Sequence, residues 1–277
     1  MTTMNITAAD VNKLRKQTGA GMMDCKSALT EANGDFEVAV DILRKKGQKV
    51  AAKRSDRDAT EGVVIAKTVN AGKKGVVIML NCETDFVAKN ADFNSFVENI
   101  LNIAIEKNPA TLEDLKKLPY NSDITISDKI IEQTGVIGEK LDLSVYEVIN
   151  AETVVAYNHP GNRLSSIVGL NKSNFEEMAR DVAMQIAAMA PIAIDKDGVT
   201  KDTIDREIEI GKELAIQEGK PVEMAEKISL GRLNKFFQEN TLLNQQYVKD
   251  GKLTIKQYLS QGDKDLTVTA FKRISVG

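Results

Sequence analysis

Residues 81–90 read NCETDFVAKN and connect an expected strand to an expected helix. The run before them, residues 76–80 (VVIML), is apolar throughout, which is typical of a buried strand. The run after them repeats apolar side chains at helical spacing (Phe93, Phe96, Val97, Ile100, Leu101 and Ala104). Strand-to-helix connections are usually short, so the length of this one, with its two acids and one aromatic residue, needs an explanation.

An internal repeat shows how much longer this connection is. Residues 64–80 and 154–170 both run from a strand-like segment through a polar turn to a second apolar strand, over the same number of positions. The next helix is expected to start at Phe93 in the first copy, 13 positions on, and at Phe175 in the second, 5 positions on. The first copy therefore holds eight additional residues, and these include residues 84–87.

The additional residues have two interpretations. A loop accepts extra length at little cost in free energy, so they could be a tolerated surface insertion. However, Phe86 and Val87 lie at the centre, and leaving a Phe side chain in water forgoes about 2 kcal/mol of burial. We therefore expect the tip to meet either the protein's own core or a binding partner.

The composition describes an ordinary globular chain and excludes several classes. The 277 residues are 42% apolar and 28% charged, enough for one large domain or two to three small ones. No apolar run is long enough to span a bilayer, and no signal-peptide pattern follows the first Met, so no membrane contact is expected. The net charge of −3 and the absence of Trp argue against direct nucleic-acid binding. Cys25 and Cys82 are too few for a disulfide framework or a zinc site and fit a cytoplasmic location.

Three short helices are expected in residues 1–55. Thr7 and Asp35 are candidate N-caps, and Asn33 with Gly34 is a stop signal before the third helix. Met22 and Met23 are adjacent, so both cannot face one small core. We expect at least one of them to lie on an adaptable binding surface; the alternative is that both are packed.

Residues 44–57, at the end of the third expected helix, include seven basic residues: Arg44, Lys45, Lys46, Lys49, Lys53, Arg54 and Arg57. The expected structure is the frayed end of that helix plus a solvated linker. A contact with RNA or phosphate is the functional alternative.

The rest of the chain alternates strands and helices. A short helix is expected over residues 127–134, after which Gly135 and Gly138 lead to a strand over residues 143–149, expected to pair with residues 153–157. Residues 202–240 show two helical patterns separated by a Gly-Lys-Pro break, which predicts an antiparallel helical hairpin projecting from the body. Residues 266–274 alternate as a half-buried strand does.

Signatures of catalysis are missing. There is no phosphate-binding loop, zinc-ligand spacing or nucleophile elbow. The single histidine, His159, lies in a Pro-Gly turn without a neighbouring acid or Ser, so it is either a turn residue or a partner contact. The chain is therefore expected to be a binding protein and not an enzyme, with no cofactor and no metal.

Two long stretches resemble the signatures of the translation elongation factor Ts family. They are residues 14–29 (LRKQTGAGMMDCKSAL) and residues 81–90, and the resemblance covers essentially the whole chain. It implies an α+β fold: an N-terminal three-helix ubiquitin-associated-like domain, then a core of two related α+β subdomains with an inserted antiparallel helical hairpin. The implied boundaries are residues 1–55, 56–140 and 141–277, with the hairpin at about residues 202–240.

The resemblance also implies a function and a set of site residues. The family exchanges guanine nucleotide on elongation factor Tu, binding its GDP-bound and nucleotide-free forms. The matching residues Thr84, Asp85, Phe86 and Val87 are implied to insert beside the Mg²⁺ and phosphates of that partner and to loosen both. Met22, Met23 and His159 are implied as further contacts.

Two other hypotheses stay open at this point. One is a non-catalytic scaffold that binds a small partner through the three-helix domain. The other is an RNA-associated protein that uses the basic residues 44–57, which would bind RNA with a strong dependence on salt.

Overall fold

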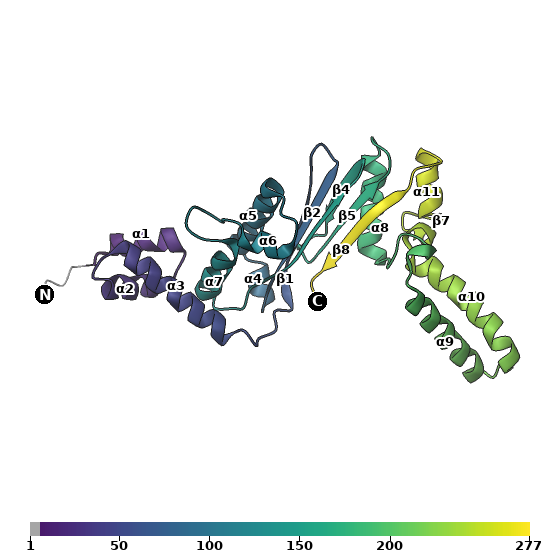
Figure 1. The fold of residues 1–277 in the computed structure, drawn as a ribbon, viewed down its shortest axis with the longest axis horizontal. Helices are drawn as coiled ribbons and strands as arrows, with labels where there is room; N and C mark the ends of the chain where they lie inside the picture. Colours follow the sequence, from purple (N-terminus) through teal and green to yellow (C-terminus); the bar gives the residue numbers. More distant parts are fainter. Residues whose placement is uncertain (1–5) are drawn as a thin grey trace.

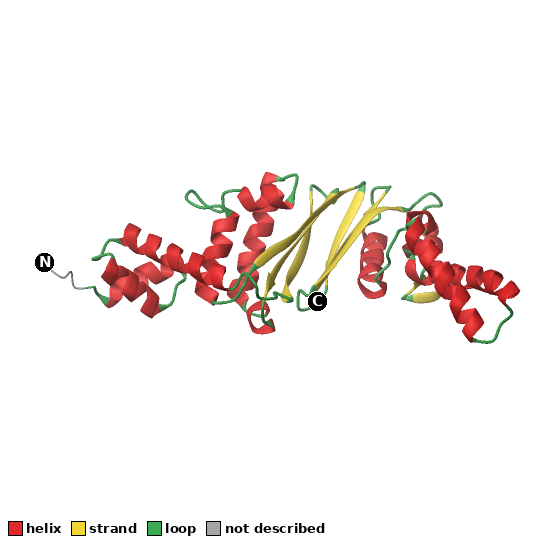
Figure 2. Cartoon of the chain, turned by 60° about the horizontal axis from the view of Figure 1, so that its bottom comes forward, coloured by secondary structure: helices red, strands yellow, loops and turns green. Residues whose placement is uncertain are grey.

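The computed structural model describes residues 6–277; residues 1–5 of the expected first domain lie outside the described part. The molecule is elongated, with a helical region at the N-terminal end, two sheets in the middle and a pair of long helices at the other end (Figures 1 and 2). The predicted α+β class and the N-terminal helical region are confirmed. In the described part, no helix is both long enough and apolar enough to cross a membrane.

The N-terminal helices begin at the predicted caps. They are α1 (Ala8–Thr18), α2 (Met22–Glu31) and α3 (Phe36–Lys53). Thr7 forms a reciprocal capping box with Asp10, and Asp35 accepts hydrogen bonds from the first amides of α3. A small buried core holds the three helices together (Val11, Leu14, Ala20, Cys25, Ala28, Leu29, Ala32 and Ala39).

The prediction that residues 44–53 form the frayed end of the third helix is wrong. These residues continue α3 as a regular helix that packs on α7 (Ile126–Ile137), so they are not a frayed end. The helices cross at Gly47 and Gly135, where a Cβ added to Gly135 would lie 2.5 Å from the Gly47 Cα. Packing therefore orders a segment whose sequence is mainly basic and small. Gly135 lies inside α7 and does not lead out of it. The helix ends at Ile137, and Gly138 caps it with a φ of 80°, which suits glycine.

Two three-stranded antiparallel sheets form the centre. The first has the order β1-β2-β3 and the second β4-β5-β8. The repeat predicted from the sequence corresponds to the two hairpins, in which Val64 pairs with Met79 and Val154 with Gly169. The strands are β1 (Glu61–Val69), β2 (Lys74–Cys82), β3 (Asp142–Asn150), β4 (Thr153–Asn158), β5 (Leu164–Leu170) and β8 (Val268–Ser275).

The sheets pack face to face between two helices. Helix α5 (Ala91–Lys107) buries its apolar face on the first sheet, and α8 (Glu176–Met189) buries its face on the second. A separate apolar cluster fills the space between the sheets (Val64, Ala66, Val77, Ile149, Val154, Ile167 and Val276). The centre is therefore a four-layer stack of helix, sheet, sheet and helix (Figure 2).

The predicted pairing of residues 143–149 with residues 153–157 is wrong. Strand β3 pairs with β2, and β4 pairs with β5. Tyr146 and Val148 pack on the α5 side of the first sheet, whereas Val154 packs between the sheets, so the chain changes sheets at residues 150–152. The short connection permitted a hairpin, but the free edge of β4 meets the first hairpin instead: the Val154 N–H donates to the Gly72 carbonyl and the Ala156 N–H to the Thr68 hydroxyl at 2.9 Å. Strand β8, from the end of the chain, pairs with β5 on the other side of the second sheet.

A side chain continues the hydrogen bonding between the two sheets. The Asn158 amide accepts from the Ala66 N–H at 2.8 Å and donates to the Ala66 carbonyl at 2.9 Å. Beside it, the Val64 N–H donates to the Asn162 carbonyl at 2.7 Å. The outer edge of β1 is thus satisfied by the turn between β4 and β5, which brings that turn close to the start of the first sheet.

Helices α9 (Lys201–Gln217) and α10 (Val222–Asn240) lie side by side and extend away from the sheets (Figure 1). They approach closely where a Cβ on Gly211 would lie 3.1 Å from the Ser229 Cα. The remaining short elements were not predicted from the sequence: α6 (Leu112–Lys117), α11 (Ile255–Gly262), β6 (Gln246–Tyr247), β7 (Asp250–Thr254) and two 3₁₀ turns, Lys196–Gly198 and Leu242–Asn244.

Candidate functional site

The additional residues of the first repeat fold into a single helical turn, α4 (Asp85–Ala88), between β2 and α5. The Thr84 hydroxyl caps this turn by accepting from the Val87 N–H. Phe86 is 83% exposed, more than any other large apolar side chain of the described residues. Val87 is half-buried and packs against the core of the first sheet and α5. The tip therefore meets its own core through Val87 and presents Phe86 to solvent.

Asp85 lies beside Phe86 on the same turn. Its carboxylate accepts a hydrogen bond from the Lys89 ammonium at 2.6 Å, one helical turn later. That bond holds the pKa of Asp85 below its usual value, so the side chain is an anion at neutral pH. An exposed aromatic ring and a carboxylate thus lie side by side on one short, capped turn.

A second carboxylate braces the base of this turn from a distant part of the chain. Glu139 accepts hydrogen bonds from the Glu83 N–H at 3.1 Å, the Thr84 N–H at 3.0 Å and the Thr84 hydroxyl at 2.7 Å. Glu83 in turn accepts from the Lys140 N–H at 2.6 Å and from the Arg54 guanidinium at 2.8 Å. We call these four residues, Arg54, Glu83, Glu139 and Lys140, the clasp.

No pattern in the sequence predicts the clasp. Arg54 belongs to the basic run that is expected to be solvated, and Glu139 follows a glycine at the end of a helix without any periodic signal. The partners are 29 and 56 positions apart along the chain, and no local pattern relates them. Glu83, one of the two acids in the 81–90 stretch, is the one signal that could have suggested a cation nearby.

Burial and hydrogen bonding set the protonation states around the clasp. The Lys140 N–H and the Arg54 guanidinium lower the pKa of Glu83, which stays ionised. Burial, together with the nearby Glu139 carboxylate, raises the pKa of the Cys82 thiol to about 12. The thiol therefore stays protonated and donates to the Thr84 carbonyl at 3.2 Å, so it acts as a structural donor and not as a nucleophile.

Substituting Glu83 by glutamine is expected to reduce the loss of stability in acid. The folded-state pKa of Glu83 lies below its unfolded value of about 4.3, so its contribution is complete above that pH and is lost as pH falls through the folded-state pKa. The variant should be less stable than the parent at about pH 7 and closer to it at about pH 3.5. Urea unfolding at both pH values measures this. The exposed Glu213→Gln is the control, and an equal stability difference at both pH values would contradict the prediction.

The turn between β4 and β5 supports α4 from the other side. Asn94 donates to the Ala88 carbonyl at 2.8 Å, and its own side-chain oxygen accepts from Asn162 at 3.1 Å. His159, in the same turn as Asn162, is exposed, and its Nδ1 lies 3.0 Å from the Tyr157 hydroxyl. The structure therefore places the turn that carries His159 beside the segment that carries Phe86, although the two come from different copies of the repeat.

The methionine pair lies at the start of α2. Met22 is 55% exposed and Met23 is 73% exposed, so the alternative that both are packed is wrong. Gly19, which precedes them in the loop between α1 and α2, lines a groove of about 700 Å³ together with Phe86. The other apolar lining comes from α5, α7 and the segment before α7 (Phe93, Phe96, Tyr120, Val136 and Ile137). One binding partner could therefore contact α4 and the N-terminal helices at the same time.

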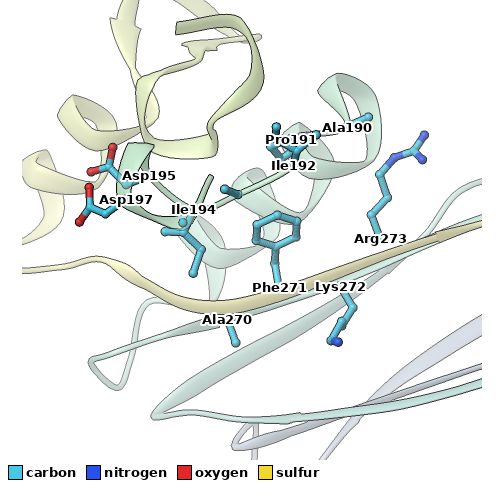
Figure 3. A pocket seen from close by; sticks show the side chains of 12 residues that line it. Ala190, Pro191, Ile192, Ile194, Asp195, Asp197, Ala270, Phe271, Lys272 and Arg273 are labelled. Atoms are coloured by element: carbon cyan, nitrogen blue, oxygen red, sulfur yellow. The ribbon is translucent and has the colours of Figure 1, made fainter. Parts of the chain in front are cut away.

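A second groove, of about 720 Å³, lies between β8 and residues 190–198, far from the predicted site residues along the chain (Figure 3). Phe271 and Ile194 point into it, with Asp195 and Asp197 at one end and Arg273 at the other. The polar ends are already engaged: Asp195 accepts from Asn244, and Arg273 donates to the Ala187 carbonyl. Among the described residues, no cluster of His, Cys, Asp and Glu could hold a metal ion here or elsewhere.

Comparisons with known proteins all point to one family. A family model described as elongation factor TS matches residues 83–277. A protein named elongation factor Ts from Amoebophilus asiaticus is 53% identical and covers 99% of this chain and 100% of its own length. Proteins of the same name from Porphyromonas gingivalis and Cytophaga hutchinsonii are 50% and 52% identical, with 98–99% of both chains covered.

Proposed function

This chain belongs to the elongation factor Ts family, and on that premise we propose that it is the guanine-nucleotide exchange factor of elongation factor Tu. It binds the GDP-bound partner, promotes GDP release and leaves a nucleotide-free complex that GTP can enter. The observation that carries the proposal is the exposure of Phe86, 83%, on a turn that the rest of the protein holds in place. An exposed aromatic ring that lines a groove with other apolar side chains is typical of a surface that another protein covers.

The proposed mechanism starts from how GTPases hold GDP. Backbone donors and Mg²⁺ bind its phosphates, and small displacements of the surrounding loops weaken both. Phe86 enters an apolar pocket of the partner beside this site and displaces those loops. Asp85 brings a negative charge towards phosphates that are already negative, which adds repulsion where the ion had supplied attraction. Mg²⁺ dislocation in the partner is thus the event that releases GDP.

The energies involved are of the right size. Burying a Phe side chain contributes about 2 kcal/mol, and an aromatic hot spot contributes about 2 to 4 kcal/mol. Each tenfold increase in GDP dissociation requires about 1.4 kcal/mol of coupling free energy. Because coupling is reciprocal, GDP weakens the binding of this protein by the same factor that this protein weakens the binding of GDP.

The preformed geometry of α4 supports the proposal. A flexible tip would lose conformational entropy on binding, and that loss would be subtracted from the coupling energy. Here Thr84 is used as the cap and Val87 anchors the turn to the core, which leaves Phe86 and Asp85 for the partner. The four residues of the proposed site thus divide into two that support the turn and two that act on the partner.

Two further surfaces are proposed as secondary contacts. Met22 and Met23 are exposed at the start of α2, near the groove that Phe86 lines, so the same face of the partner could reach them. Met side chains adapt to irregular partner surfaces. His159, exposed in the turn beside α4, is proposed to contact a different part of the partner. The chain itself is proposed to catalyse no covalent chemistry and to need no cofactor, no nucleic acid and no membrane.

The direct test measures release of fluorescently labelled GDP from elongation factor Tu with catalytic amounts of this protein. We expect release to accelerate at least tenfold and to saturate as the concentration of the factor rises. A second small GTPase of a different family serves as the control and should show no acceleration. Release from elongation factor Tu at its intrinsic rate, with a well-folded factor present in excess, would overturn the proposal.

A further inference from the structure

The clasp joins three segments that are remote in sequence. Glu139 accepts three hydrogen bonds from Glu83 and Thr84, at the start of the α4 turn. Glu83 returns one by accepting from the Lys140 N–H, so the two segments exchange side-chain-to-backbone bonds in both directions. Two such segments cannot slide past each other without breaking several charge-assisted hydrogen bonds at once.

The end of α3 is the third member. Arg54, at the C-terminal cap of α3, donates to both oxygens of Glu83 at 2.8 Å. The Lys140 ammonium donates to the carbonyls of Ser55 at 2.8 Å and Arg57 at 2.9 Å. The clasp therefore ties the N-terminal helices to the base of the turn that carries Phe86.

The hydrogen bonds of the clasp are partly buried. The Glu83 side chain is 17% exposed and that of Arg54 is 35% exposed, and Glu139 is half-buried. Screening by water is weaker for such groups than for fully exposed ion pairs. The Glu139 carboxylate also takes up the Glu83 and Thr84 N–H donors, which precede the helical turn and have no other hydrogen-bond partner among the described residues.

We propose that Glu139 is a positioning residue for nucleotide exchange: its carboxylate sets the orientation of the α4 turn, and so the direction in which Phe86 enters the partner. The proposal rests on the proposed exchange function and adds to it a residue that does not itself touch the partner's nucleotide site. Arg54 and Lys140 extend the same role, because they transmit the placement of the N-terminal helices to α4.

The test is a double-mutant cycle in the labelled-GDP assay. Glu139→Ala is expected to lower the maximal release rate on the order of tenfold in the parent and less than about twofold in the Phe86→Ala background, because it acts through Phe86. Glu139→Gln keeps one acceptor oxygen, and its maximal release rate should lie between those of the parent and of Glu139→Ala. The control is Glu98→Ala, which removes a carboxylate on α5 that pairs with Lys67 of β1, outside the clasp. This variant should leave the release rate unchanged.

Hydrogen exchange gives a second readout that does not depend on activity. The amides of Glu83, Thr84 and Val87 should exchange faster in Glu139→Ala and in the milder Glu139→Gln, while those of α5 keep their protection. Unchanged exchange at these amides would overturn the proposal, as would equal rate losses with and without Phe86. An inactive parent protein would instead count against the proposed function, so the two failures are distinguishable.

Discussion

Replacing Phe86 by alanine is expected to slow the stimulated release of GDP from elongation factor Tu by tenfold or more. The ring is 83% exposed in the free protein, so its burial can occur only on the partner. Truncating an aromatic hot spot typically costs about 2 to 4 kcal/mol of interaction energy, and about 1.4 kcal/mol already corresponds to tenfold. The loss should appear in the maximal rate, because the ring is proposed to act when the phosphate site opens.

Stopped-flow release of labelled GDP over a range of factor concentrations separates maximal rate from half-saturation. Phe86→Leu keeps an apolar side chain and should retain most of the activity. Val248→Ala truncates an exposed apolar residue, 50% exposed in the turn between β6 and β7, and should have no effect. A Phe86→Ala protein that exchanges nucleotide as fast as the parent would show that α4 is not the active element.

The same substitution should leave the free energy of unfolding almost unchanged. An exposed side chain without specific contacts usually changes stability by less than about 0.5 kcal/mol when it is truncated. Urea unfolding of Phe86→Ala and of the parent would measure this. A large loss of stability would mean that Phe86 packs on its own protein in solution, and the loss of exchange would then need another cause.

The second large effect is expected at the crossing of α3 and α7. Gly135→Leu introduces a side chain where a Cβ would already lie 2.5 Å from the Gly47 Cα, and that atom belongs to a helix backbone that cannot rotate aside. Overpacking of this kind costs about 3 kcal/mol. The helices must separate, which also displaces the N-terminal helices from the groove that Gly19 and Phe86 line.

Urea unfolding measures the stability loss, and the GDP-release assay should show a higher half-saturation concentration for Gly135→Leu. Gly231→Leu is the matched control, because Gly231 lies in helix α10 with nothing within 4 Å of its added Cβ. Glycine is a poor helix former, so the control should be as stable as the parent or more stable by about 0.5 to 1 kcal/mol. Equal unfolding midpoints for Gly135→Leu and the parent would show that the close crossing is absent in solution.

Local patterns in the sequence determined a large part of this protein. The caps at Thr7 and Asp35 and the apolar face of α5 depend on residues within a few positions of each other, and each of the two hairpins depends on strands joined by a short turn. The structure contains all of them. The additional residues around Phe86 were also recognisable, because the repeat supplied its own reference length. Family resemblance, later borne out by the comparisons, added the partner and the site residues, which stay predictions.

Tertiary structure alone decided the rest. Strand β3 joined β2 and not its neighbour in sequence, and the free edge of β4 meets the first hairpin instead, where the Val154 N–H donates to the Gly72 carbonyl. The basic end of α3 became ordered because two glycines let it approach α7, and Arg54 found a carboxylate 29 positions away. Caps, turns and amphipathic faces produce local patterns in a sequence, whereas hydrogen bonds and close packing between remote segments do not. The orientation of Phe86 depends on such hydrogen bonds between remote segments.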